Sequence, residues 1–272
     1  MKECDEFVQD LARKAGRLLC EKLNSKHRIR YKGTIDLVTE ADKMAEKMII
    51  EAISRRFPDH GILSEESAER NEKASLRWIV DPLDGTTNYA HGFPFFCVSI
   101  ALEQNGRMIL GVVYDPIRDE LFVARHQRGA SLNGRRIRVS KTGDLSKSLL
   151  ATGFPYDIRE SKENNLNYFN AMALQAQAVR RPGAAALDLA YLAAGRLDGF
   201  WELKLKPWDT AAGCLLVEEA GGVVTDLKGR PWTVDSPGVI GSNGLIHDQM
   251  IKVIQKAKKS NQTSKRAAGA LR

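Results

Sequence analysis

The pattern of apolar and polar positions predicts two helices at the start of the chain. Between residues 5 and 24 the apolar residues recur three or four positions apart, which is the spacing of an amphipathic helix. A second helix is predicted over residues 39–57, because Thr39 suits its N-cap and Pro58 follows its end. We expect both helices to pack on one face of the strands that follow them.

Further along the chain, the pattern changes to short apolar runs, which predict strands. These runs are residues 78–80, 96–102, 108–114 and 120–125. Asn105-Gly106 separates two of them and is a strong signal for a hairpin turn, and Asn133-Gly134 marks one more turn. The N-terminal half is therefore predicted to hold an antiparallel sheet.

From about residue 145 strand and helix patterns alternate. Strands are predicted over residues 148–152, 198–203, 223–226 and 238–241. Helices are predicted over residues 163–177, 184–194, 208–220 and 245–258. Gly195 follows the second of these helices and suits its C-terminal end. This alternation predicts an α/β arrangement for the second half of the chain.

The distribution of charge marks the C-terminal end as different from the rest. The net charge is +7, and six of these charges lie in residues 255–272, which contain no acid. Such an end can contact nucleic acid or acidic partners, or it is simply a solvated terminus. We expect three parts: an N-terminal α+β half over residues 1–143, a C-terminal α/β half over residues 144–258, and a basic, disordered tail over residues 259–272.

Composition excludes several classes of protein. No apolar run approaches the roughly 18–20 residues that cross a bilayer, and the acidic N-terminus lacks the features of a signal peptide. We therefore expect a cytoplasmic protein with no membrane partner. The four cysteines are scattered without a Cys-x-x-Cys pair, which predicts free thiols in place of disulfides or a zinc ribbon. They are Cys4, Cys20, Cys97 and Cys214.

Several carboxylates come directly after apolar segments, where a chain can aim side chains into a cleft. Asp81 follows a predicted strand, and Asp84 lies three residues later in a predicted turn with Gly85. Glu65 also follows an apolar pair, and Asp209 opens a predicted helix. Paired carboxylates suit Mg²⁺, which prefers oxygen ligands and keeps open positions for water and phosphate. On its own, however, this Asp-Pro-Leu-Asp-Gly sequence is also typical of a surface turn.

Four segments together resemble the inositol monophosphatase family. They are residues 36–42 (DLVTEAD), 64–67 (SEES), 81–94 (beginning DPLDGTTNY) and 208–222 (beginning WDTAAG). They come in the order of the family and with similar spacing, and the bacterial members are the most similar. The resemblance implies the layered αβαβα sandwich of the sugar phosphatases, an α/β (α+β) fold.

The resemblance also implies a site for two to three Mg²⁺ ions. Glu65, Asp81 and the backbone carbonyl of Leu83 would hold the first ion. Asp81, Asp84 and Asp209 would hold the second, and Glu65 would help to hold a third, looser ion. Multiple metal ions can activate water for attack on a phosphate, so no nucleophilic side chain is needed.

Roles in catalysis and substrate binding follow from the same resemblance. Asp42, Glu65 and Thr86 are the implied catalytic residues, with Thr86 and Asp42 orienting the attacking water. If Thr86 begins a helix turn, free backbone N–H groups there would face the phosphate. Lys32 resembles a lysine on a mobile loop of the family. The implied substrate-binding residues are Glu65, Asp84, Gly85, Thr86, Gly183, Ala185, Glu202 and Asp209.

The activity implied is Mg²⁺-dependent hydrolysis of inositol 1-phosphate or a similar small sugar or polyol phosphate. Related phosphatases act on histidinol phosphate or fructose 1,6-bisphosphate, and these substrates stay open as alternatives. Some bacterial members resemble regulators that bind the transcription and antitermination machinery. A binding role of this kind is the second hypothesis for the function of the chain. The resemblance further implies a homodimer and inhibition by lithium. Because all the implied metal ligands are present, we expect an active enzyme.

Overall fold

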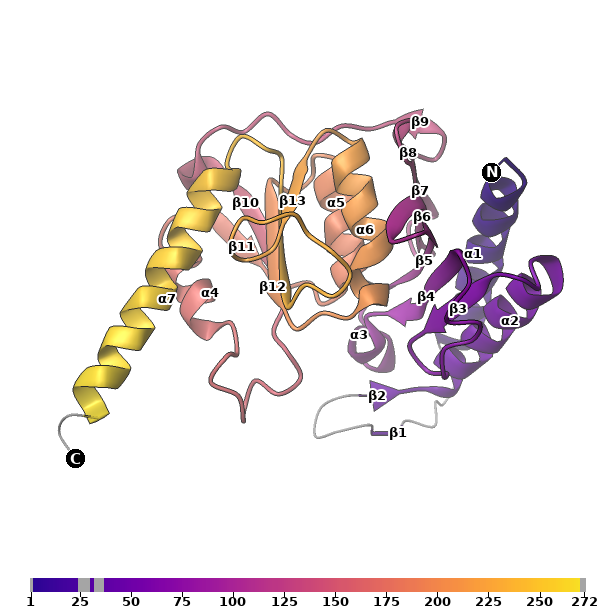
Figure 1. The fold of residues 1–272 in the computed structure, drawn as a ribbon, viewed down its shortest axis with the longest axis horizontal. Helices are drawn as coiled ribbons and strands as arrows, with labels where there is room; N and C mark the ends of the chain where they lie inside the picture. Colours follow the sequence, from indigo (N-terminus) through magenta and orange to yellow (C-terminus); the bar gives the residue numbers. More distant parts are fainter. Residues whose placement is uncertain (1, 24–29, 32–36, 270–272) are drawn as a thin grey trace.

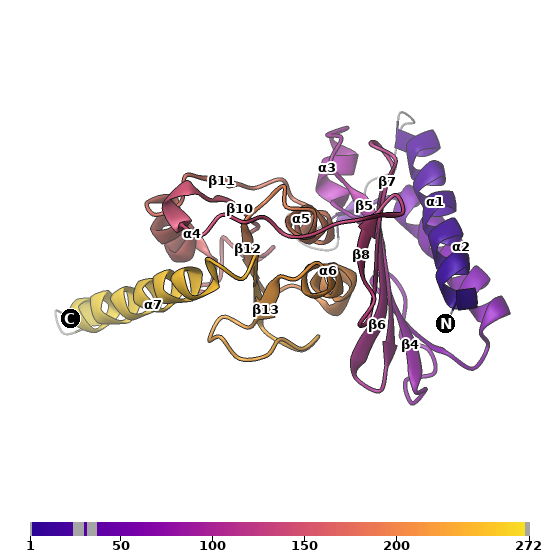
Figure 2. The ribbon, with the colours of Figure 1, turned by 90° about the horizontal axis from the view of Figure 1, so that it is seen from above.

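A layer of two helices separates two β-sheets in the computed structural model, which describes residues 2–23, 30–31 and 37–269 (Figure 1). Within these residues the helices are α1 (Lys2–Leu23), α2 (Glu40–Arg56), α3 (Thr86–Ala90), α4 (Leu166–Ala173), α5 (Ala185–Ala193), α6 (Pro207–Glu219) and α7 (His247–Gly269), with a 3₁₀ turn η1 (Leu145–Lys147). Seen from above, α1 and α2 cover one face of the first sheet, and α5 and α6 cover the other (Figure 2). The second sheet follows, and α4 and α7 lie beyond it. The predicted αβαβα sandwich is confirmed.

The first sheet has seven strands within the described part of the chain. They are β3 (Gly61–Ser64), β4 (Leu76–Asp84), β5 (Cys97–Gln104), β6 (Arg107–Asp115), β7 (Glu120–Arg125), β8 (Gly129–Leu132) and β9 (Arg135–Arg136), in sequence order. From β4 to β9 each pair is antiparallel, as predicted, with the β5–β6 turn at Asn105 and Gly106. The prediction missed β3, which pairs with β4 in parallel. A separate pair is formed by β1 (Arg30–Tyr31) and β2 (Leu37–Val38).

The second sheet has five strands within the described residues and mixes both directions. They are β10 (Leu149–Thr152), β11 (Ala178–Arg180), β12 (Gly199–Leu203), β13 (Val223–Thr225) and β14 (Gly238–Ser242). Their order is β11-β10-β12-β14-β13, with β10 parallel to both of its neighbours and β14 antiparallel to β12 and β13. This arrangement has the α/β character that the alternating pattern predicts.

The last helix is longer than the sequence pattern predicts. We expected it to end at Lys258, but α7 continues to Gly269, into the segment predicted to be disordered. Residues 256–268 contain no Pro or Gly, and Lys, Arg, Gln and Ala outnumber the weaker helix formers Ser, Asn and Thr, so the composition permits this extension. The proposed boundaries between the three parts stay predictions.

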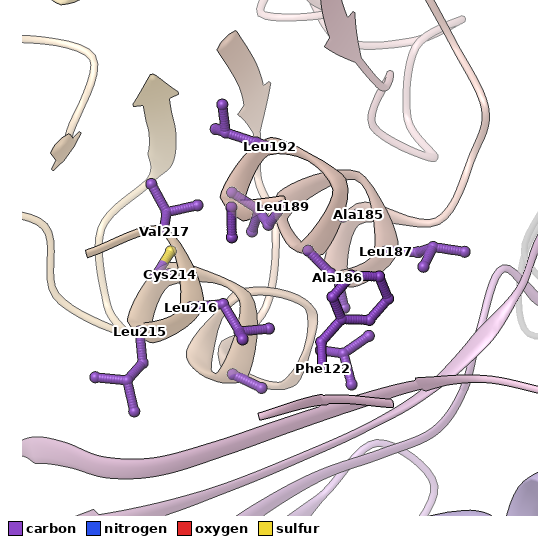
Figure 3. Packing of buried hydrophobic residues seen from close by; sticks show 14 of the residues in the cluster. Phe122, Ala185, Ala186, Leu187, Leu189, Leu192, Cys214, Leu215, Leu216 and Val217 are labelled. Carbon is purple, nitrogen blue, oxygen red and sulfur yellow. The ribbon is translucent and has the colours of Figure 1, made fainter. Parts of the chain in front are cut away.

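The helices α5 and α6 form the centre of the largest hydrophobic core. Their side chains are buried on both sides because each helix lies between the two sheets (Figure 3). Leu189 and Leu216 are 0% exposed, and Phe122 of β7 packs in the same cluster. Close packing of this kind leaves the two helices little freedom to shift relative to β4. Residues at their N-terminal ends are therefore held at set positions against the first sheet.

Two further expectations can be compared with the structure. All four cysteines are free, as predicted. Among the described residues no helix combines the length and apolar character that crossing a bilayer requires.

Candidate active site

Two neighbouring strands place the first pair of carboxylates. β3 and β4 run parallel, and Ser64 pairs with Val80. The residues that follow, Glu65 and Asp81, therefore lie beside each other at the same end of the sheet. Asp81 is 2% exposed, and Glu65 is half-buried. The parallel pairing of β3 is thus what brings together two carboxylates that are 16 positions apart in the sequence.

The segment between Asp81 and Asp84 is a bulged strand and not the predicted turn. Asp81 pairs with Ser99 of β5 and Asp84 with Cys97, so three steps along β4 oppose two along β5. The chain turns only at Gly85, whose φ of 94° lies in the left-handed region that glycine adopts readily. Gly85 then precedes α3, so the expected helix turn begins at Thr86.

Hydrogen bonds connect this segment and α3 to the start of α5 and the turn before it. Asp84 Oδ2 accepts a hydrogen bond from the backbone N–H of Ala186 at 2.7 Å. The amide nitrogen of Asn88 donates to the carbonyl oxygen of Pro182 at 2.8 Å and to that of Phe95 at 2.7 Å. These contacts hold the turn with Gly183 and Ala185 against residues 84–88. The role of Asn88 was missed, because its partner carbonyls are far away in the sequence.

A buried carboxylate holds the hydroxyl group of Thr86. Thr86 Oγ1 lies 3.0 Å from Asp42 Oδ1 and 3.0 Å from the carbonyl oxygen of Leu83. Asp42 Oδ2 accepts hydrogen bonds from the backbone N–H and the hydroxyl of Thr39, the N-cap of α2. Burial raises the pKa of Asp42, and the hydrogen bonds from Thr39 and Thr86 oppose that rise. The structure therefore places Asp42 directly behind Thr86.

The loop that carries Glu65 is fixed by a second buried carboxylate, that of Glu46. Glu46 is 5% exposed and lies on α2. Its oxygens accept hydrogen bonds from Ser64 Oγ at 2.6 Å, from the backbone N–H of Glu66 at 2.9 Å and from Ser67 Oγ at 2.7 Å. Because these donors lie on both sides of Glu65, they set the direction in which its side chain leaves the chain. The sequence pattern did not indicate this role, since Glu46 lies within an ordinary helical pattern.

Asp209 reaches the site from the first turn of α6. Pro207 occupies the first position of the helix, and the backbone N–H of Lys206 donates to Asp209 Oδ2 at 2.7 Å. Ser99 Oγ of β5 donates to the carbonyl oxygen of Trp208 at 3.2 Å. This contact ties the start of α6 to the strand that pairs with Asp81.

Glu202 lies on β12, in the second sheet, whereas Asp81 and Asp84 lie on β4 in the first sheet. It is 8% exposed and lines the same cleft as the other carboxylates. Its carboxylate group lies directly against the backbone of Gly153. A β-carbon on Gly153 would come within 2.1 Å of Glu202 Oε1, so a larger residue at this position would force the Glu202 side chain to shift.

All these elements open on one cleft with a volume of about 450 Å³. Each residue predicted for the site lines it, except Asp42, which lies behind Thr86, and Lys32, which is outside the described residues. The cleft has further lining residues that the sequence analysis did not assign: Thr87, Asn88, Gly153, Phe154, Pro155, Tyr156, Asp157, Arg181, Ala184, Leu203, Lys204, Leu205, Lys206 and Trp208. The Gly-Phe-Pro sequence between a predicted strand and a predicted helix was a signal for a loop, but not for its position at the site.

The carboxylates of the cleft are buried close to one another. Burial, and then the charges of Glu65, Asp84 and Asp209, raise the pKa of Asp81 well above its usual range. Burial and the Glu65 charge raise the pKa of Asp84 to about 6, although its hydrogen bond from Ala186 opposes the rise. Buried like charges of this kind are stabilised by a bound cation.

The donor atoms suit a hard divalent cation. They are all oxygens, four carboxylates and the Leu83 carbonyl, which is ligand chemistry that suits Mg²⁺, Ca²⁺ or Mn²⁺. Among the described residues, no three His, Cys, Asp or Glu side chains are already gathered as a finished metal cage. Without a cation these carboxylates repel one another, and they accept backbone hydrogen bonds: Asp81 from Leu83 N at 3.0 Å and Asp209 from Lys206 N.

The raised pKa values of these carboxyl groups predict how the stability of the fold depends on pH. A carboxyl group with a raised pKa in the folded state contributes stability at low pH, and this contribution is lost as pH rises through the folded pKa. For Asp84 the window runs from its ordinary value of 3.8 to about 6. Without metal at pH 7, Asp84→Asn should therefore be more stable than wild type, by on the order of 3 kcal/mol.

Urea unfolding in the presence of EDTA at pH 4 and pH 7 measures this difference. The advantage of the variant should be small at pH 4 and large at pH 7. Mg²⁺ at pH 7 should stabilise wild type more than the variant, because the ligand binds only the folded site. If the stability advantage of Asp84→Asn is equal at both pH values, or grows as pH falls, the pKa of Asp84 is not raised in the folded state.

Comparison with known proteins agrees with this site. A model of the inositol monophosphatase family matches residues 1–259. Inositol-1-monophosphatase of Synechocystis sp. is 48% identical over 220 residues, which cover 80% of this chain and 77% of that protein. Nus factor SuhB of Escherichia coli K12 is 47% identical over 243 residues, or 88% of this chain and 91% of that protein.

Solved structures show the same fold. The inositol monophosphatase from Anabaena (Nostoc) sp. has a TM-score of 0.86 and 44% identity, and the match covers 94% of this chain and 96% of that one. The Thermotoga maritima IMPase has a TM-score of 0.87 and 39% identity, covering 96% and 99%. The likeness therefore extends over both halves of the chain and is not confined to the four motifs.

Proposed function

We propose that this chain, which belongs to the inositol monophosphatase family, uses Mg²⁺ to hydrolyse inositol 1-phosphate or a similar small polyol phosphate. The family is one of phosphatases, which are phosphoric monoester hydrolases. The observation that carries the finer proposal is the cleft. It is lined by carboxylates from separate segments, by a hydroxyl group held from behind, and by the carboxylate of Glu202.

Mg²⁺ is the proposed cofactor, with two to three ions. Glu65, Asp81 and the carbonyl of Leu83 would hold one ion, and Asp81, Asp84 and Asp209 a second, with Glu65 near a third. Bound ions of this kind lower the pKa of water and neutralise negative charge on the phosphate group. The support lies in the oxygen-only donor set and in the raised pKa values of Asp81 and Asp84.

The catalytic role of Thr86 is to orient the attacking water. Its single proton is donated either to Asp42 or to the Leu83 carbonyl, and in both cases the Thr86 oxygen keeps lone pairs that accept a hydrogen bond from water. Asp42 cannot turn away, because its other oxygen is held by Thr39. We expect the backbone N–H groups of Gly85 and Thr86 to bind the phosphate oxygens.

The polyol part of the substrate binds beside Glu202 in the cleft. Glu202 is the proposed partner of two ring hydroxyls, since its carboxyl group has two oxygens that can accept hydrogen bonds. The turn with Gly183 and Ala185 offers backbone groups beside it, held in place by Asn88. The complete proposed set of substrate-binding residues is Glu65, Asp84, Gly85, Thr86, Gly183, Ala185, Glu202 and Asp209.

A panel of phosphate esters tests the substrate proposal. With Mg²⁺, inositol 1-phosphate should give a higher kcat/KM than histidinol phosphate or fructose 1,6-bisphosphate, and EDTA should reduce turnover of every ester to background. Glu202→Gln should weaken the preference for the polyol ester more than it slows hydrolysis of a simple ester. Fast turnover of histidinol phosphate beside failure of inositol 1-phosphate would overturn the choice of substrate and leave the phosphatase assignment in place.

A second candidate function is a role in transcription. It is favoured by the relatives named Nus factor SuhB, which are 43–47% identical and match 88–90% of this chain. The two functions do not exclude each other, because the proposed metal site is complete in either case. Affinity purification with the full chain and with a chain lacking residues 255–272, probed for transcription factors, discriminates between the readings. Recovery of no such factor with either chain would leave the phosphatase reading alone.

Assembly as a homodimer and inhibition by lithium are two further proposals. Both rest on the family, and lithium would act at the loosely held third ion. In the apolar stretch of residues 92–96, Phe95 and Phe96 are buried, whereas Phe93 is 52% exposed and available to a second subunit.

A further inference from the structure

A buried side chain joins the two ends of the loop that forms one wall of the cleft. We call residues 153–164 the cleft loop; it leaves β10 after Thr152 and ends at Asn165, which precedes α4. Asn165 is 0% exposed. Its amide nitrogen donates to the carbonyl oxygen of Gly153 at 2.6 Å and to Thr152 Oγ1 at 2.9 Å. The first and last residues of the loop region are therefore bonded directly to each other.

The same amide group is also bonded to the strand that carries Glu202. The indole N–H of Trp201 donates to Asn165 Oδ1 at 2.8 Å, and Thr152 Oγ1 donates to the carbonyl oxygen of Trp201 at 2.5 Å. Trp201 directly precedes Glu202 on β12. Both donor hydrogens of the Asn165 amide and its oxygen are thus in use, as a buried amide requires.

The position of Asn165 is unusual for a residue that starts a helix. An asparagine at an N-cap normally accepts a hydrogen bond from the helix backbone with its side chain, but the Asn165 side chain makes no such bond to α4. Its φ of 72° lies in the left-handed region, where few residues other than glycine, asparagine and aspartate are found. Both features indicate that the residue serves the contacts with Gly153 and Trp201 and not the helix.

Those contacts act on Glu202 through the backbone around it. Its carboxylate group lies against Gly153 so closely that an added β-carbon would meet Oε1, Cδ and Oε2 at 2.1–2.4 Å. Trp201 precedes Glu202 on β12 and packs on the opposite face of the sheet, so its bond to Asn165 holds the strand and does not touch the carboxylate. Since Asn165 holds both Gly153 and the strand at Trp201, its loss would free the backbone against which the Glu202 carboxylate lies.

We propose that Asn165 is a positioning residue that sets the preference for polyol esters by holding Gly153, against which the Glu202 carboxylate lies, and strand β12 at Trp201. The inference rests on the proposed function, in which Glu202 accepts hydrogen bonds from the hydroxyl groups of the substrate. Asn165 touches no substrate itself and acts only through its neighbours. Loss of its amide should therefore affect esters that carry ring hydroxyls and spare those that carry none.

The test compares two esters in the Asn165→Gly variant. Glycine accepts a φ of 72° and removes the amide, so the backbone is kept while the hydrogen bonds are lost. The KM for inositol 1-phosphate should rise about tenfold, with kcat nearly unchanged. The kcat/KM for p-nitrophenyl phosphate, which has no polyol hydroxyls, should stay within about twofold of wild type. Asn170→Gly, at an exposed position of α4, is the matched control and should change neither value.

A double variant shows whether the effect passes through Glu202. If it does, adding Asn165→Gly to Glu202→Gln should cost inositol 1-phosphate hydrolysis less than about twofold more. If the glycine variant does not fold, Asn165→Asp keeps the shape and the φ but places a carboxylate oxygen against the Gly153 carbonyl, and it should give the same pattern. Equal losses for both esters, or a full tenfold loss in the Glu202→Gln background, would refute the role of Asn165. Wild type that hydrolyses neither ester would refute the proposed function, and the inference with it.

Discussion

Replacement of Asp84 by asparagine is expected to lower kcat/KM for inositol 1-phosphate by at least about 1000-fold at saturating Mg²⁺, because a metal contribution of several kcal/mol is lost. Asparagine keeps the size of the side chain, and its oxygen can still accept the hydrogen bond from Ala186 at 2.7 Å. It loses the negative charge that would bind the second ion. The fold should therefore survive while turnover fails.

Steady-state kinetics over a range of Mg²⁺ concentrations measures this effect, with circular dichroism to establish that the variant is folded. Asp226→Asn is a suitable control, because Asp226 is also a buried, hydrogen-bonded carboxylate but does not line the cleft. Its activity per folded molecule should match that of wild type. If Asp84→Asn kept more than about a tenth of wild-type turnover, the metal site would have to lie elsewhere.

The second large effect is expected at Thr86. Thr86→Val removes the hydroxyl and preserves the shape of the side chain, so kcat should fall by about 100-fold or more. Mg²⁺ affinity should change little, because no side-chain ligand is removed. Thr86→Ser retains the hydroxyl between Asp42 and the Leu83 carbonyl and should recover most of the activity.

Kinetics together with calorimetric Mg²⁺ titration separates the two roles. A valine variant that is slow but binds Mg²⁺ normally agrees with a water-orienting hydroxyl. A valine variant that loses Mg²⁺ binding as severely as Asp84→Asn would show instead that Thr86 holds the proposed metal ligands of β4 in position. Unchanged kcat would remove Thr86 from the catalytic residues.

The elements that were predictable from sequence are those with a local signal. Asp81 stands at the end of an apolar run, and Asp209 follows Pro-Trp at the start of a helix, so both patterns are visible within ten residues. The hairpin at Asn105-Gly106 has the same local character. The structure begins a helix at Pro207 and turns the hairpin at Asn105-Gly106 as these signals predict, whereas Asp81 lies within β4 and not after its end.

The parts that were not predictable depend on contacts between distant residues. β3 has four residues and no alternating pattern, so its parallel pairing with β4 had no sequence signal. Glu46 looks like an ordinary polar position of a helix, and it is buried only because the end of β3 lies over it. Asn165 lies in a polar segment of the kind that usually forms a solvated loop. Its 0% exposure arises from packing beneath Trp201 and Thr152.

The hydrogen bond from Ala186 to Asp84 also has a consequence for protein synthesis. Its two residues are 102 positions apart, and Asp209 follows Asp84 by 125 positions. A ribosome that adds roughly 5–20 residues per second needs about 6–25 s to make the intervening chain. Between the synthesis of β9 and that of α5 and α6 the first sheet has no helices to cover the apolar face that packs on α5 and α6. A ribosome that stalls before residue 209 releases a polypeptide that contains the Asp-Pro-Leu-Asp-Gly-Thr motif but cannot assemble the site.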